Sequence, residues 1–122
     1  MALRVMIVDD ALFMRNMLKD IFGRAGYDVV AEAENGEMAL ELYQETKPDL
    51  VTMDIVMPKK SGIEALQDIM AENPEACVVM VSALGQDALV LDAVESGAKD
   101  FIVKPFNEDK VLEIIKRITD HS

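Results

Sequence analysis

Short runs of largely apolar residues alternate along the chain with longer segments in which apolar residues recur every three or four positions. The short runs are RVMIV, VVAEA, LVTM, VVMVS and DFIV, which begin at positions 4, 29, 50, 78 and 100. Uninterrupted apolar runs of this length are typical of buried strands, whereas a spacing of three or four indicates amphipathic helices. The pattern therefore predicts five strands, each followed by a helix.

Turn and capping residues mark the ends of the expected helices. These helices span about residues 11–25, 37–45, 62–70, 86–96 and 107–118, and their stop and cap residues are Gly26, Asn35, Pro48, Asn73, Pro74, Gly97 and Asn107. Repeated strand-then-helix order predicts an α/β fold in which a parallel sheet is covered by helices on both faces. No stretch is typical of a linker or a repeat, so residues 1–122 are expected to form one domain.

Composition narrows the functions that such a domain can have. The chain has 122 residues, of which 51% are apolar, and a net charge of −11. That charge makes nucleic acid a poor direct partner, and no apolar run is long enough for membrane insertion, so a cytoplasmic protein is expected. The single cysteine, Cys77, rules out an internal disulfide and is expected to be a buried thiol in a strand. Met6, Met14, Met17, Met53 and Met80 are expected to fill the core.

Ligands of such sheets bind outside the carboxyl ends of the strands, so the residues that end or follow each run are of interest. These residues are Asp9 and Asp10 after the first run, Asp54 after the third, Ser82 at the end of the fourth and Lys104 after the fifth. Clustered carboxylates repel one another unless a cation binds between them. Oxygen ligands with no Cys or His nearby point to Mg²⁺, with Mn²⁺ as the alternative.

A bound metal ion would allow one of these carboxylates to attack phosphorus. Asp54 is the best candidate, because it stands alone after an apolar strand, while Asp9 and Asp10 together suit a metal cradle. Lys104 and Ser82 would then stabilise the transferring phosphoryl group. Taken singly, each residue has a plainer interpretation, with the acids and Ser82 as turn or helix-cap residues and Lys104 as a solvated lysine. The functional interpretation depends on complementary groups at four strand ends.

The motifs IVDD, VTMDIVMPKKSG, VSA and KDFIVKPF resemble, in order and spacing, those of the receiver domain of two-component response regulators. The resemblance covers essentially the whole chain, and within the family it is strongest to the single-domain regulators of chemotaxis. It implies a flavodoxin-like (βα)5 fold with a doubly wound, five-stranded parallel sheet in the order 2-1-3-4-5. It also implies a protein that catalyses only its own phosphorylation and autodephosphorylation and is not otherwise an enzyme.

The resemblance assigns roles to the acidic residues and their neighbours. Asp54 is implied as the phosphoacceptor. The implied Mg²⁺ ligands are Asp10 directly, Asp9 through water, Asp54 itself and the backbone carbonyl of Val56. The side chains of Val56 and Leu84 flank the path of the hydrolytic water in the family. Because both are apolar here and offer that water no hydrogen bond, slow autodephosphorylation is expected.

A second set of implied roles concerns the response to phosphorylation. Ser82 and Lys104 would hold the phosphoryl oxygens, and the bond between Lys104 and Pro105 is expected to be cis. Phe101 matches the switch aromatic of the family, which turns inward when Ser82 moves toward the phosphoryl group. The plainer interpretation of Phe101 as a core residue is compatible with this role, since the switch exchanges exposure for burial.

The implied output surface combines the fourth helix, the fifth strand and the fifth helix, at about residues 87–96, 100–103 and 108–117. A histidine kinase is the implied phosphodonor, the flagellar motor switch or another signalling protein the implied target, and a phosphatase a further partner. A stand-alone receiver in a non-chemotaxis relay is the main alternative. A Mg²⁺-dependent aspartyl-phosphate phosphatase fits less well, because Val56 occupies the place of its second Asp. A flavin-binding module would need a hydroxyl-rich phosphate loop where the sequence has DDALFM.

Overall fold

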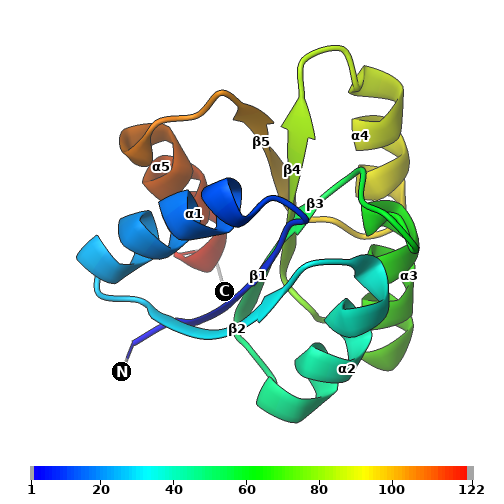
Figure 1. Cartoon of the computed structure of the whole chain (residues 1–122), viewed down its shortest axis with the longest axis horizontal. Coiled ribbons are helices and arrows are strands. Elements are labelled where there is room, and N and C mark those ends of the chain that lie inside the picture. Colours follow the sequence, from blue (N-terminus) through cyan, green and yellow to red (C-terminus); the bar gives the residue numbers. More distant parts are fainter. Residues whose placement is uncertain (1, 121–122) are drawn as a thin grey trace.

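A computed structural model describes residues 2–120 as strands and helices in strict alternation (Figure 1). In chain order these are β1 (Arg4–Val8), α1 (Leu12–Arg24), β2 (Asp28–Ala33), α2 (Gly36–Thr46), β3 (Leu50–Asp54), α3 (Gly62–Glu72), β4 (Val78–Ala83), α4 (Asp87–Glu95), β5 (Asp100–Lys104) and α5 (Glu108–Thr119). The strands form one parallel sheet in the order β2-β1-β3-β4-β5. This confirms the expected fold class and strand order. The remaining positions of the expected 1–122 domain lie outside the described residues.

The helices cover both faces of the sheet. α1 and α5 lie against one face, and α2, α3 and α4 lie against the other (Figure 1). Successive side chains of β1 enter opposite layers, so Val5 and Ile7 pack beneath α1 and α5, whereas Met6 and Val8 pack on the other side. Burial on both faces explains why the central strands are apolar without interruption.

Side-chain caps begin three of the helices, two of them at the expected residues Asn35 and Asn107 and the third at Ser61, which was not predicted as a cap. The side-chain oxygens of Asn35, Ser61 and Asn107 accept hydrogen bonds from backbone N–H groups three residues further on, at 3.0, 3.2 and 2.8 Å. Gly97 follows α4 with a φ of +114°, a left-handed conformation that glycine adopts easily. Within residues 2–120, no helix combines the length and the apolar character needed to cross a membrane.

Three expectations about burial were wrong. Met14 and Met17 are only partly buried, because that side of α1 faces the loop after β5, where they line a surface hollow with Pro105 and Phe106. Cys77 is also partly exposed, and it precedes β4 instead of lying within it. Met6, Met53 and Met80 do fill the core, as expected.

Candidate functional site

Three carboxylates gather at the edge of the sheet where the strands end. Asp9 and Asp10 follow β1, and Asp54 ends the neighbouring strand β3. Carboxylate oxygens of the three residues lie within 4.8 Å of one another, although Asp9 and Asp54 are buried and Asp10 is exposed. Like charges at this separation repel, so the cluster is better suited to binding a cation than to standing alone.

The surroundings of Asp9 leave one of its carboxylate oxygens without a hydrogen bond. Its backbone N–H donates to the Ala33 carbonyl of β2 at 3.0 Å, and its Oδ1 accepts from the Ala11 N–H at 2.9 Å. Oδ2 is buried without a hydrogen-bond partner, although Lys104 Nζ lies 3.6 Å away. A buried charged oxygen in this state is costly, and a hard cation would satisfy it. A donor set made only of oxygens fits Mg²⁺.

Lys104 ends β5 and reaches both buried carboxylates. Its Nζ lies 3.6 Å from Oδ2 of Asp9 and 3.6 Å from Oδ2 of Asp54. Burial, followed by repulsion from Asp9, raises the pKa of Asp54 to about 6, and the attraction of Lys104 opposes this rise only in part. A single lysine therefore does not balance the negative charge of the cluster.

Close packing at the start of α3 holds the backbone that carries Asp54. The N–H of Gly62 donates to the Ile55 carbonyl at 2.8 Å. A Cβ on Gly62 would lie 1.9 Å from the backbone oxygen of Asp54, so no larger residue fits without displacing this strand end. The glycine thus fixes the position of the candidate phosphoacceptor.

The other residues assigned from the sequence stand on strands β4 and β5 or in the loops that follow β3, β4 and β5. Ser82 is buried in β4 and, among the described residues, makes no side-chain hydrogen bond to the acids. Phe101 is 37% exposed on β5, and the bond between Lys104 and Pro105 is cis. Val56 and Leu84 are 55% and 79% exposed. The plainer helix-cap interpretation fits poorly here, because α1 begins after Ala11 without a side-chain cap.

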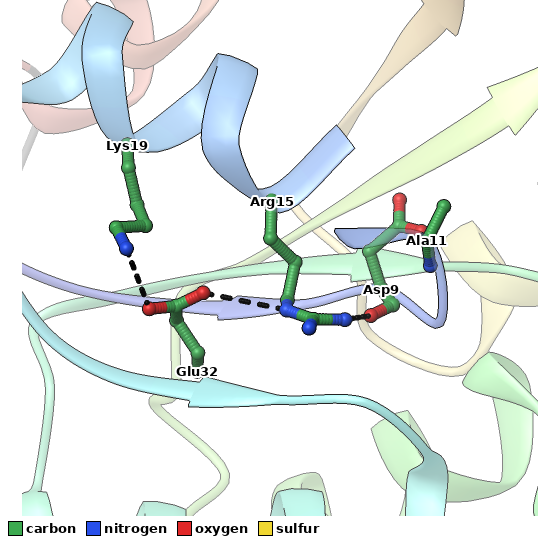
Figure 2. A network of polar contacts seen from close by, with 5 residues as sticks. All are labelled: Asp9, Ala11, Arg15, Lys19 and Glu32. Atoms are coloured by element: carbon green, nitrogen blue, oxygen red, sulfur yellow. Dashed lines mark hydrogen bonds and ion pairs between the residues drawn. The ribbon is translucent and has the colours of Figure 1, made fainter. Parts of the chain in front are cut away.

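The sequence did not predict a polar network that joins the backbone of Asp9 to strand β2. Figure 2 shows Arg15 of α1 between the backbone of Asp9 and the side chain of Glu32 on β2, with Lys19 on the other side of Glu32. A signal was present in the sequence, since Arg15 lies near the N-terminus of a helix, where the helix dipole disfavours a cation. Such a position suggests a specific partner.

Fold and site together define a class of protein. The chain belongs to the response regulator receiver domain family, whose sequence model matches residues 5–116. It is 57% identical over 117 residues to the chemotaxis protein CheY of Bacillus subtilis, covering 96% of this chain and 98% of that protein. It is 54% identical over 119 residues to CheY of Thermotoga maritima, covering 98% and 99%. The chain is therefore a CheY-like receiver domain of two-component chemotaxis regulators.

A solved structure of a similar protein agrees with this assignment. A chain in the crystal structure of the CheX-CheY-BeF3-Mg+2 complex from Borrelia burgdorferi superposes with a TM-score of 0.92 at 41% identity. The match covers 96% of this chain and 89% of that chain. As its name states, that complex contains Mg²⁺ and a second protein, CheX.

Proposed function

We propose that the protein accepts a phosphoryl group on Asp54 in a reaction that requires Mg²⁺. The observation that carries the proposal is the juxtaposition of three carboxylates with Lys104 at one sheet edge, with one buried Asp9 oxygen left without a hydrogen bond. Asp10 and Asp54 would bind the ion directly and Asp9 through water, and the backbone carbonyl of Val56 would complete the protein ligands. The ion would neutralise charge on the phosphoryl oxygens and on the cluster.

The step at Asp54 is a displacement at phosphorus. A carboxylate oxygen of Asp54 forms the new O–P bond while the N–P bond of a phosphohistidine donor breaks, and the histidine nitrogen keeps the electron pair. Lys104 Nζ lies 3.6 Å from Oδ2 of Asp54. After the transfer it would pair with the negatively charged phosphoryl oxygens. The Ser82 hydroxyl would supply a further hydrogen bond to them. Hydrolysis of the resulting acyl phosphate restores Asp54.

The output would be a change in the α4-β5-α5 face. This face carries exposed apolar side chains, notably Leu91 and Val94 on α4 and Phe101 and Val103 on β5. Movement of Ser82 toward the phosphoryl group would open space for Phe101 to turn inward, which would alter the surface offered to a partner. A signalling target such as the flagellar motor switch would recognise the altered face.

We further propose that residues 1–122 act as a single receiver domain in the cytoplasm. A histidine kinase would supply the phosphoryl group, and a phosphatase would be a further partner. The complex with CheX is a property of the Borrelia protein, and it supports the idea that a second protein can bind a receiver of this shape. A stand-alone receiver in a relay outside chemotaxis would use the same site and the same chemistry.

Intact mass measurement after incubation with acetyl phosphate tests the proposal. We expect an adduct of about 80 Da on the wild type that needs Mg²⁺ and is absent from Asp54→Ala. Asp20→Asn, which changes an exposed acid on α1, is the matched control and should keep the adduct. An adduct that persists in Asp54→Ala, or that forms equally well in EDTA, would contradict the proposal.

A further inference from the structure

Arg15 joins the acidic loop to the neighbouring edge strand. Its guanidinium donates to the backbone carbonyl of Asp9 at 2.7 Å and to Oε1 of Glu32 at 3.3 Å. Lys19 Nζ lies 3.1 Å from the other oxygen of Glu32. The Arg15 side chain is only 12% exposed, whereas the Lys19 side chain is 42% exposed. Arg15 is therefore held between two elements, while Lys19 contacts only the outer side of Glu32.

The carbonyl that Arg15 holds belongs to the peptide group between Asp9 and Asp10. Fixing this peptide plane fixes the position of the N–Cα bond of Asp10, and so restricts where its carboxylate can lie. Asp10 is exposed, so its placement depends strongly on the backbone before it. Asp9 is already held by Ala33 and Ala11. The hydrogen bond from Arg15 thus restrains the peptide bond that joins the buried Asp9 to the exposed Asp10.

We propose that Arg15 is a positioning residue for the metal cradle, and that Glu32 orients its guanidinium. The inference rests on the proposed metal site, but it concerns residues that do not contact the ion. Groups that orient metal ligands typically change metal affinity by about 10-fold to 100-fold when they are removed. Because Arg15 holds only one peptide group, next to the exposed Asp10, we expect the lower end, about tenfold.

Electrostatics and positioning make opposite predictions for the removal of Arg15. A positive charge near a cation site opposes cation binding, so loss of the guanidinium charge alone should tighten Mg²⁺ binding. If Arg15 positions the cradle, its loss should weaken binding instead. Lys19 provides the matched comparison. Lys19→Met also removes one positive charge beside Glu32, but it leaves the hydrogen bond to the Asp9 carbonyl in place.

A Mg²⁺ titration of the unphosphorylated full chain, followed by amide NMR spectra, measures the affinity and reports the fold in the same samples. We expect Kd to rise about tenfold in Arg15→Met and to stay the same or fall in Lys19→Met. Arg15→Lys keeps the charge but cannot span both partners, so we expect an intermediate Kd and a folded protein. Unchanged or tighter binding in both Arg15 variants would overturn the inference. No Mg²⁺ binding by the wild type would instead overturn the metal site of the proposed function.

Discussion

The acidic cluster should lower the stability of the protein when no divalent ion is present. Asp54→Asn removes one of the three carboxylates and keeps the size and shape of the side chain. The raised pKa of Asp54 means that the folded protein holds this carboxyl in its protonated form up to about pH 6. Above that pH the carboxylate is charged in both states, and only the folded state bears the cost of burial and repulsion. We therefore expect Asp54→Asn to be more stable than the wild type at pH 7.5 in EDTA.

The size of the effect follows from the pKa. A rise from 3.8 to about 6 corresponds to about 3 kcal/mol of destabilisation at neutral pH. Solvent screening at this open edge of the sheet reduces the expected gain to about 1–2 kcal/mol. The gain should shrink as the pH falls from 6 toward 4, because the folded protein then binds a proton that the unfolded chain does not. Below about pH 4 the contribution of Asp54 should vanish.

Urea unfolding followed by circular dichroism measures the difference. With a slope of about 2 kcal/mol per molar urea, the middle of the range for small proteins, the midpoint of Asp54→Asn should rise by about 0.5–1 M at pH 7.5. Asp20→Asn, which neutralises an exposed acid, should change the midpoint little. Excess Mg²⁺ should stabilise the wild type more than the variant and reduce the gap. An unchanged or lower midpoint for Asp54→Asn at pH 7.5 in EDTA would refute the reasoning.

Three further changes test other parts of the structure. Replacing Val56 by Asn and Leu84 by Glu should speed loss of the phosphoryl group several-fold, because each new side chain can hydrogen-bond the attacking water; equal decay of the mass adduct would contradict this. Gly62→Ala should lower the free energy of unfolding by at least about 2 kcal/mol, because the new Cβ would meet the Asp54 carbonyl oxygen. Gly23→Ala is the control, since a Cβ there meets nothing within 4 Å, and it should be neutral or stabilising in urea unfolding. Asn35→Ala should cost about 1 kcal/mol through loss of the α2 cap, and an unchanged melting temperature would show that the cap contributes nothing.

Much of the fold could be predicted because the central strands are buried on both faces. Their apolar runs differ clearly from the helical spacing that follows, so the alternation is visible without any structure. The proximity of Asp9, Asp54 and Lys104 could also be predicted, because parallel strands all end at the same edge. The family resemblance supplied the strand order, which periodicity alone does not contain.

The remaining features depend on how elements pack, which a linear pattern does not record. Asp9 and Asp10 are adjacent in the sequence, yet the first is buried, with hydrogen bonds to Ala11 and Ala33, and the second is exposed. The partner of Arg15 is 17 positions away on a strand that pairs with β1. Such pairings require the register of the sheet to be known.

The acids, Ser82 and Lys104 stand on strand ends or on the residues directly after them, and no helix supplies any of these groups. In evolutionary terms, the outer surfaces of the helices can change through mutation without altering the groups of the proposed site. A gene for such a domain can therefore be duplicated, and the copies can acquire new partners while each retains the same strand-end groups. Within one cell, the recognition of surfaces alone then decides which copy responds to which partner.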